Sequence, residues 1–411
     1  MTHMPCVSVV IPCYNQAQYL GEAIQSALDQ SYRDFEIIVV DDGSTDNTSQ
    51  VIASFGDAIR YVRQANRGLA GARNTGIQAA RGEFIGLLDS DDMWLPDYLA
   101  AMIQAFGDDR TIGAVYSGWH YIDAAGKMLP RTNIHIFPRD QVHHAMTSMN
   151  FVVPSGVVVR RTCFEKLGLF DETFGQAQGC EDWDMWLRVL RDYAMVGVPQ
   201  ALVKYRTHGE NMSSRLEQMY ASLVHVAGNH FGSETGDPTE WTQDKQLAYA
   251  GIYFWRTIAN YQRQQPDLAA ESFRRACRIS PHLVTSIDTY YSLLFAELPF
   301  GYVGDVERID LNRNAQRLVE LLNGIFTDPQ IPAQLRSNRR RAMGVAYFQI
   351  GLLYYGRRDL AHTLRALAHA ARYLPTLVGN RQWATTFAKA MLGRRLLNLL
   401  LELKQSFALR M

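Results

Sequence analysis

The sequence carries no excess of charge, few cysteines and no long apolar run. Lys plus Arg and Asp plus Glu number 41 each. This balance argues against a strongly basic nucleic-acid-binding protein, so we expect no nucleic-acid partner. The five cysteines are scattered without a CxxC pair, which argues against a disulfide framework or a zinc knuckle and favours a reducing cytosol. The first residues lack a signal-peptide pattern, and no stretch reaches the roughly 18 apolar residues of a membrane span, so we predict a cytoplasmic protein.

What the sequence does contain is an alternation of strand and helix patterns in its N-terminal half. Short β-branched runs, typical of strands buried on both faces, occupy residues 7–11, 35–40, 59–62 and 84–88. Helical spacing lies between them, and this alternation predicts a mainly parallel sheet flanked by helices. The pattern becomes mixed after residue 112 and helical after residue 214. We therefore predict an α/β domain over residues 1–214 and an all-α domain over residues 215–411.

Two segments of the helical half are similar to each other. Residues 247–281 and 341–375 both show an aromatic-rich helix, a polar turn with Asp-Leu-Ala, an Ala-rich helix and a closing Pro. This arrangement resembles tetratricopeptide-type helical hairpins, and the alternative is a plain helical bundle. Either form could bind a protein partner or a second copy of the chain.

The C-terminal segment 391–411 supports a separate hypothesis. Its leucines share one helical face, and Arg394, Arg395 and Lys404 lie near them in the sequence. Such an amphipathic basic helix can lie in a membrane interface, which would bring the protein to the inner face of a membrane and to a lipid-linked acceptor. Packing against the preceding helices, or a dimer contact, is the alternative.

Three carboxylates follow the apolar run 84–88 at once. Asp89, Asp91 and Asp92 repel one another, and in a parallel sheet they would lie at the carboxyl edge, where ligands bind. Hard oxygen donors together with a diphosphate suit Mg²⁺ or Mn²⁺. The alternative is a solvated turn in which Asp91 or Asp92 caps the helix that begins near Pro96.

Two further polar clusters belong to the same predicted edge. Asp41 and Asp42 end the second strand, and a carboxylate there can accept hydrogen bonds from a nucleobase imide or a ribose hydroxyl. The run 66–77 places glycines, Arg73 and Asn74 at a predicted helix start. Backbone donors and a guanidinium at such a place suit a diphosphate or an acidic neighbour.

The segment GCEDWDMW, residues 179–186, places carboxylates among tryptophans at another helix start. Glu181 and Trp183 could form a platform for a sugar or acceptor, and a carboxylate beside it could act as general base on an acceptor hydroxyl. The alternative is charge complementarity at a helix N-terminus, with the tryptophans in the core. His208 follows a predicted strand and becomes a metal-ligand candidate only if the fold brings it to the DSDD carboxylates.

In this order, the motifs resemble the family 2 glycosyltransferases with the GT-A fold. The motifs are VSVVIPCYN, VVDDGSTDNT, NRGLAGARNTGI, LLDSDDMW, EDWDMWLR and YRTHGENMS. The resemblance spans residues 6–214 and implies transfer of a sugar from a nucleotide sugar to an acceptor hydroxyl, generally with inversion at the anomeric carbon. A UDP-sugar is the favoured donor, and a glycan, a lipid-linked molecule or a protein would be the acceptor.

The resemblance also implies roles for single residues. Asp89 and Asp91 match the Asp-x-Asp motif that holds Mn²⁺ or Mg²⁺ on the diphosphate, with Asp92 as an alternate. His208 matches a histidine that approaches the metal in some members, and Asp182 matches the catalytic base. The residues that match positions around the nucleoside are Pro12, Tyr14, Asn15, Asp41 and Asp42.

Two other functions stay open at this point. Nucleotidyl transfer would require a Gly-rich, basic phosphate loop after the first strand, where this sequence has CYNQAQYL. A non-catalytic, transferase-like scaffold with a helical binding region would be favoured by a lost acid, yet Asp89, Asp91 and Asp182 are all present.

Overall fold

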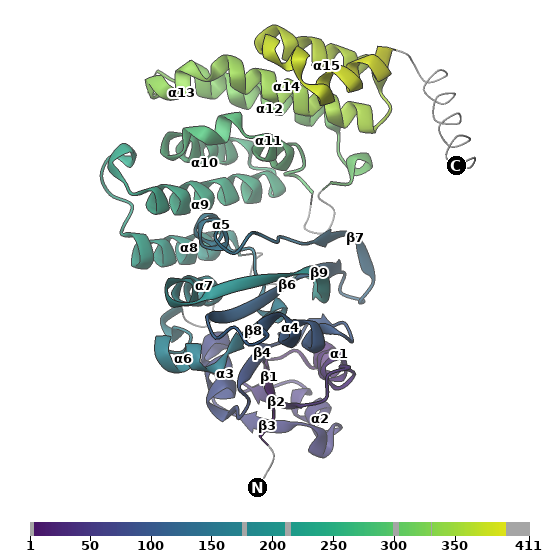
Figure 1. The fold of residues 1–411 in the computed structure, drawn as a ribbon, viewed down its shortest axis with the longest axis vertical. Helices are drawn as coiled ribbons and strands as arrows, with labels where there is room; N and C mark the ends of the chain where they lie inside the picture. Colours follow the sequence, from purple (N-terminus) through teal and green to yellow (C-terminus); the bar gives the residue numbers. More distant parts are fainter. Residues whose placement is uncertain (1–3, 175–178, 210–214, 299–303, 330, 392–411) are drawn as a thin grey trace, which may run out of the picture. The chain divides into compact units, whose positions relative to one another are not determined.

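A computed structural model describes residues 4–174, 179–209, 215–298, 304–329 and 331–391. The chain divides into two compact units (Figure 1). The first comprises residues 1–236 and 242–252, and the second comprises residues 237–241 and 253–411. The limits of 1–214 and 215–411 for the two domains stay a prediction.

The N-terminal strands of the first unit form the expected parallel layer. They are β1 (Val7–Cys13), β2 (Phe35–Asp41), β3 (Arg60–Arg63) and β4 (Phe84–Leu87). All pairs among them are parallel, in the order β3-β2-β1-β4. The central strands β1 and β4 are buried along their whole length, as their runs of apolar residues require in a sheet covered on both faces.

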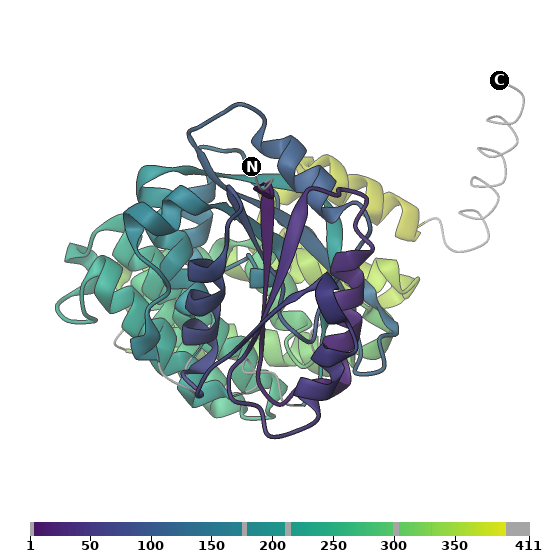
Figure 2. The ribbon, with the colours of Figure 1, turned by 90° about the horizontal axis from the view of Figure 1, so that it is seen from below.

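Three helices connect and cover these strands. They are α1 (Ala17–Leu28), α2 (Thr48–Ala53) and α3 (Gly68–Ala79). Figure 2 shows α1 and α2 on one side of the strands and α3 on the other. In the core, Val9 and Ile11 of β1 pack in one cluster with Leu20 and Ile24 of α1.

The remaining strands extend the same sheet. They are β5 (Met93–Trp94), β6 (Ile112–Ile122), β7 (Met128–Asn133), β8 (Val157–Arg160) and β9 (Ala194–Arg206). The strand order continues from β4 through β8, β6 and β9 to β5, while β7 pairs with β6. Antiparallel pairs enter only with β5, β7 and β8, and β6 and β9 are parallel. The expected α/β class, with a curled and mostly parallel sheet flanked by helices, is confirmed.

Further helices complete the first unit. They are α4 (Tyr98–Phe106), α5 (Val142–Ser148), α6 (Arg161–Leu167), α7 (Glu181–Asp192) and α8 (Leu216–Phe231). Helix α7 begins after Cys180, which has a positive φ of 77°, and three acidic residues occupy its first turn. A contact between His230 Nε2 and Asp184 Oδ1, at 2.8 Å, ties α8 to α7.

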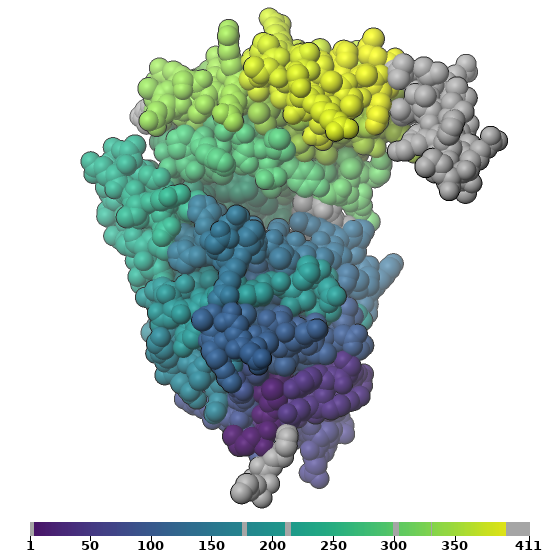
Figure 3. Space-filling model, in the orientation of Figure 1, coloured from purple at the N-terminus to yellow at the C-terminus, as the bar shows by residue number. Residues whose placement is uncertain are grey.

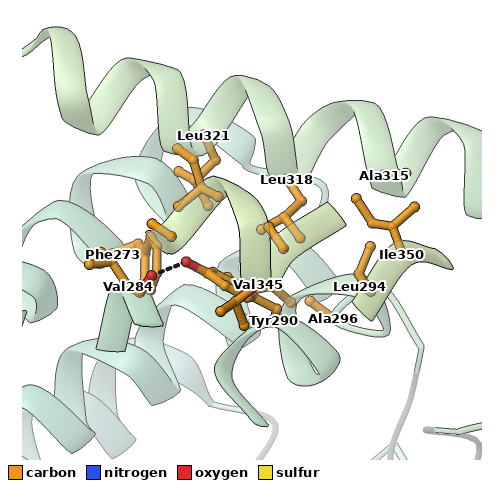
Figure 4. Close-up of a cluster of buried hydrophobic side chains, with 14 of the residues drawn as sticks. Phe273, Val284, Tyr290, Leu294, Ala296, Ala315, Leu318, Leu321, Val345 and Ile350 are labelled. Carbon is orange, nitrogen blue, oxygen red and sulfur yellow. Dashed lines mark hydrogen bonds between the residues drawn. The ribbon is translucent and has the colours of Figure 1, made fainter. Parts of the chain in front are cut away.

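In its described residues the second unit forms helices joined by turns, without strands, as predicted. Its helices are the end of α9 (Gln243–Gln262), α10 (Pro266–Ile279), α11 (Ile287–Leu294), α12 (Leu311–Thr327), α13 (Ala333–Ser337), α14 (Arg339–Gly356) and α15 (Leu360–Tyr373). Figure 4 shows its core, where the Tyr290 hydroxyl donates to the carbonyl of Val284 beside Phe273. The similar segments 247–281 and 341–375 each contain two successive helices, and their tetratricopeptide character stays a prediction.

The membrane hypothesis is only partly within the described chain. No helix in the described ranges is both long and apolar enough to cross a membrane. The amphipathic segment predicted at 391–411 lies outside the described residues except for Met391.

Candidate functional site

The predicted motifs gather at the carboxyl edge of the parallel strands. The register pairs Cys13 with Asp41 at the ends of β1 and β2, and Val10 with Leu87 where β4 ends beside β1. Loops that follow neighbouring parallel strands at this edge form the usual ligand site of an open α/β sheet. The residues expected to contact a donor therefore share one region.

The residues expected around the nucleoside hold the first two loops together. Pro12 lies within β1, and Tyr14 after it is 49% exposed. Asn15 Oδ1 accepts a hydrogen bond from the backbone N–H of Thr45 at 2.8 Å. Tyr14 is therefore accessible to a ligand, whereas Asn15 uses its side chain to join the loop after β1 to the loop after β2.

Asp41 is fully buried and is committed to neighbouring protein donors. Its Oδ1 accepts from the backbone N–H of Ser44 at 2.8 Å, and its Oδ2 accepts from the hydroxyl of Tyr61 at 2.9 Å. Asp41 thus stabilises the turn that contains Gly43. The φ of Gly43 is +80°, a value that favours glycine. Its contact with a nucleoside stays a prediction.

Asp42 links the end of β2 to the start of α3. Its Oδ1 accepts from Gln64 Nε2 at 2.7 Å and from the backbone N–H of Arg67 at 2.8 Å, and its Oδ2 accepts from the backbone N–H of Gly68 at 2.8 Å. A carboxylate at a helix N-terminus satisfies otherwise unpaired donors. Asp42 thus stabilises the start of α3, and its contact with a nucleoside stays a prediction.

Arg73 joins two acidic motifs that are far apart in the sequence. The side chain is 1% exposed, donates through Nη2 to Asp89 Oδ1 at 2.7 Å and pairs through Nη1 with Glu181. Burial opposes the charged form, yet the charges of Asp89 and Glu181 raise the pKa of Arg73. Arg73 therefore brings the DSDD carboxylates next to the start of α7.

Asn74, the neighbour of Arg73, has a structural role. Its Nδ2 donates to the carbonyl of Phe170 and to Glu172 Oε1, both at 2.9 Å, and its Oδ1 accepts from the N–H of Phe170 at 2.9 Å. The residue is 3% exposed. It ties α3 to the segment that precedes α7, and contact with a diphosphate stays a prediction.

The fold brings His208 to the acidic cluster. His208 Nε2 lies 3.0 Å from Asp91 Oδ2, and the imidazole stacks on Tyr19 with ring centroids 5.2 Å apart. Arg206, which ends β9, donates its Nε to the carbonyl of Asp91 at 2.7 Å. His208 therefore lies beside the DSDD carboxylates, as a metal ligand at this place would have to. Its role as a metal ligand stays a prediction.

Asp92 is buried and accepts hydrogen bonds from two distant segments of the chain. Its Oδ2 accepts from Ser155 Oγ at 2.6 Å, and its Oδ1 accepts from the backbone N–H of Arg206 at 2.9 Å. Burial, followed by the charges of Asp91 and Asp89, raises the pKa of Asp92 well above its usual value. Both oxygens already have protein donors, so Asp91 is the better placed of the two to meet a cation.

Asp89 is also influenced by its neighbours. Its backbone N–H donates to Ser155 Oγ at 3.0 Å. Burial raises the pKa of Asp89, the charge of Arg73 opposes this, and Asp91 adds to it. The Asp89 carboxylate thus interacts with the positive charge of Arg73 and with the negative charge of Asp91.

A divalent cation fits the donors at this place. In the described part of the chain, no group of three or more His, Cys, Asp or Glu side chains is arranged to hold a metal. Asp91 and His208 nevertheless offer a carboxylate and an imidazole within 3.0 Å of each other. Mg²⁺ and Mn²⁺ sites commonly use few protein ligands and take the remainder from water and substrate phosphates.

Asp182 lies in the first turn of α7 with one hydrogen bond to each oxygen. Oδ2 accepts from Asn150 Nδ2 at 2.9 Å, and Oδ1 accepts from the N–H of Trp183 at 2.8 Å. Burial and then the charge of Glu181 raise the pKa of Asp182 to about 7, although Arg73 and the hydrogen bonds oppose the shift. A carboxylate that titrates near neutral pH is suited to general base catalysis.

The residues proposed as a sugar platform lie in the interior. Trp183 is 1% exposed and donates its indole N–H to the carbonyl of Met146 at 2.8 Å. Glu181 is 3% exposed and paired with Arg73. An interior indole offers no face to a sugar in this conformation, which corresponds to the core alternative, so we assign neither residue a contact with the sugar below.

Sequence reasoning missed three residues of this region: Asn150, Ser155 and Arg206. Arg206 could have been found, because it belongs to the motif YRTHGENMS and precedes His208 by two positions. Asn150 and Ser155 lie in a loop-like segment without a chemical pattern. Only the folded chain shows that they donate to Asp182 and Asp92.

Comparison with known proteins adds independent information. Residues 8–168 match the model of glycosyl transferase family 2. An uncharacterized glycosyltransferase of Rickettsia typhi is 33% identical over 232 residues, which cover 53% of this chain and 69% of that protein. The chondroitin synthase of Escherichia coli is 29% identical over 218 residues, which cover 52% of this chain and 30% of that protein. The solved structure of the mannosyltransferase PcManGT from Pyrobaculum calidifontis, in complex with GDP-Man and Mn2+, aligns at 20% identity with a TM-score of 0.46, covering 68% of this chain and 76% of that one.

Proposed function

This chain belongs to glycosyl transferase family 2, and on that premise we propose that it transfers a sugar from a nucleotide-sugar donor to an acceptor hydroxyl, with inversion at the anomeric carbon and a divalent cation. The UDP-sugars are the proposed donors. The similarity to a chondroitin synthase favours a growing glycan as the acceptor and polysaccharide biosynthesis as the setting.

The observation that carries the proposal is the bridge made by Arg73. Its guanidinium contacts Asp89 on one side and Glu181, the neighbour of Asp182, on the other. A direct displacement needs a leaving diphosphate and a base around one sugar carbon, with the base opposite the leaving group. The link between two acidic motifs through one buried arginine supports a single site that combines donor binding with proton acceptance.

We assign the carboxylates different tasks. Asp91 and His208 would hold Mn²⁺ or Mg²⁺. Asp89, which is paired with Arg73, would add negative charge beside them. Bound there, the cation would offset the charge that develops on the leaving nucleoside diphosphate. Asp182 accepts the proton of the acceptor hydroxyl, and the Asn150 amide orients the carboxylate for this transfer.

The test is a binding and turnover screen with UDP-, GDP- and dTDP-sugars, with and without Mn²⁺. In wild type we expect metal-dependent binding of one sugar nucleotide, and we expect Asp91→Ala to lose it. Asp182→Asn should retain donor binding while kcat falls about 10²- to 10⁴-fold, the usual contribution of a general base. The anomeric configuration of the product, read by NMR, tests inversion.

A matched control is Asp108→Ala, because Asp108 is an exposed carboxylate outside the acidic motifs. This variant should bind and turn over the donor as wild type does. If wild type binds no nucleotide sugar with any metal, the proposed reaction is wrong. If Asp182→Asn turns over at the wild-type rate, the proposed base is wrong while the reaction stands.

A further inference from the structure

The positive charge of this neutral chain is concentrated in its C-terminal helices. Residues 331–391 contain ten Lys or Arg residues and a single acid, Asp359. The basic residues are Arg336, Arg339, Arg340, Arg341, Arg357, Arg358, Arg365, Arg372, Arg381 and Lys389. An ordinary solvated surface mixes both signs, so an excess of this size in a chain with no net charge requires another explanation.

The helical hairpin of α14 and α15 gathers half of these residues at one end. Tyr354 stacks on His362, and Tyr347 stacks on His369, with ring centroids 4.9 Å apart in both pairs. The two helices therefore run antiparallel. A Cβ built on Gly344 would lie 2.5 Å from the Cβ of Leu374, which places the start of α14 beside the end of α15.

We name this end the basic end, and it comprises Arg339, Arg340, Arg341, Arg372 and Arg381. The first three open α14 and Arg372 lies in the last turn of α15. Arg381 begins the helical residues 381–391, which pack on α15 through the indole N–H of Trp383, a donor to the carbonyl of Leu367 at 3.2 Å. Asp359 lies at the opposite end of the hairpin, where it contacts His362.

The basic end is exposed and lacks internal compensation. All five arginines are exposed, and their helices form the yellow-green to yellow surface in Figure 3. Within the described ranges, none of the five forms an ion pair with a carboxylate. The three arginines that open α14 also face the positive end of that helix's dipole, an unfavourable placement. The three arginines that open α14 therefore have no stabilising partner within the described part of the fold, which indicates an anionic partner outside the protein.

An apolar side chain accompanies the charges. Val378 is 50% exposed in the short 3-10 helix Pro375–Gly379, which directly follows α15 and lies between Arg372 and Arg381 in the chain. Basic side chains with exposed apolar ones among them are typical of surfaces that bind the interface of an anionic membrane. A nucleic acid or an acidic glycan would use the charges and leave Val378 without a role.

We propose that the basic end of the α14–α15 hairpin docks on an anionic lipid surface. The interaction goes beyond the proposed sugar transfer and does not use residues 392–411. It would hold the enzyme at a membrane where acceptors attached to lipid are concentrated.

The experiment is co-sedimentation of the full-length protein with vesicles of phosphatidylcholine alone or with 30% phosphatidylglycerol, a composition chosen to carry about one negative charge in three lipids. We compare wild type with Arg339→Gln/Arg340→Gln/Arg341→Gln. A basic residue near an anionic surface contributes about fivefold to partitioning, so the triple variant should bind about 100-fold more weakly. Wild-type binding should also weaken steeply at high salt.

The matched control is Arg33→Gln/Lys127→Gln/Arg191→Gln, which removes the same charge from exposed positions of the first unit. It should bind the anionic vesicles as wild type does. A second variant, Arg372→Gln/Arg381→Gln, removes the other part of the basic end and should weaken binding about 25-fold.

Three results would overturn the proposal. One is equal binding of wild type to neutral and anionic vesicles, or no binding to either. Another is full binding by both variants of the basic end, which would place the contact elsewhere in the chain. The third is capture of wild type by an acidic polysaccharide or DNA, lost in the triple variant, without binding to vesicles. None of these outcomes depends on turnover, so a failed transferase assay leaves the test intact.

Discussion

Replacing Asp182 by Asn should lower kcat about 10²- to 10⁴-fold and also stabilise the first compact unit at pH 8. The environment of Asp182, chiefly its burial and then the charge of Glu181, raises its pKa from 3.8 to about 7. The native protein therefore keeps a proton on this group between about pH 4 and pH 7 that the unfolded chain releases. The stability from this proton is lost as the pH rises, and at pH 8 the native state bears the full cost of the ionised carboxylate.

The size of the effect follows from the shift. About three pKa units correspond to roughly 4 kcal/mol at 1.36 kcal/mol per unit. Asn offers one acceptor oxygen where Asp182 uses two, for Asn150 and Trp183, and the lost hydrogen bond costs about 1 kcal/mol. The net gain at pH 8 is then roughly 2–3 kcal/mol, which raises Tm by about 5–10 °C for a unit of this size.

The measurement is the Tm of wild type and Asp182→Asn at pH 5 and pH 8. Asp184 in the same helix supplies the control, because its burial is outweighed by His230 and Arg188, which lower its pKa. Asp184→Asn should therefore lower Tm at pH 8. If Asp182→Asn has an unchanged or lower Tm at pH 8, or the same gain at pH 5, Asp182 is not held in a strained ionised state and the reasoning fails.

Four further outcomes follow from the same site. The kcat of wild type should fall about tenfold per pH unit below pH 7, because Asp182 must be ionised to accept a proton. A kcat that stays constant down to pH 5 would contradict this. Asn150→Ala removes a donor to the ionised form and should move that limb to higher pH with the donor KM unchanged; a drop in kcat without a pH shift would indicate a structural role. Arg73→Ala leaves Asp89 and Glu181 without their shared cation and should destabilise the protein by about 3–5 kcal/mol in urea unfolding, whereas wild-type stability would refute the bridge. EDTA should abolish turnover and Mn²⁺ restore it, and His208→Ala should need more Mn²⁺; equal Mn²⁺ requirements would remove His208 from the metal site.

The sequence located the elements of the sheet well. The β-branched runs at 7–11, 35–40, 59–62 and 84–88 became β1, β2, β3 and β4 within about two residues at each end. A run of apolar residues in a strand is a local signal, because each such residue must be buried wherever the strand lies. The spacing of apolar residues in a helix is a local signal too, so the helices of the second unit could also be predicted.

Local patterns were less informative about what each polar side chain does. Asp41 and Asp42 accept hydrogen bonds from nearby protein donors, which no local pattern indicated. Their contact with a nucleoside stays a prediction. Trp183 could be a sugar platform or a core residue by its position at a helix start, and it lies in the core. Which face of a helix is buried depends on the segment packed against it, here the end of α5 that supplies the carbonyl of Met146.

The order of the motifs by itself determined the family, the class of the fold and the residues worth testing. Only the tertiary structure decided that Arg73 joins Asp89 to Glu181, which lies 108 positions away, and that His208 reaches Asp91 across 117 positions. It also decided that Asn150 and Ser155, which carry no motif, donate to Asp182 and Asp92. Strand formation follows from the apolar pattern of a few neighbouring residues. A contact between distant side chains depends on the register and packing of every element that lies between them.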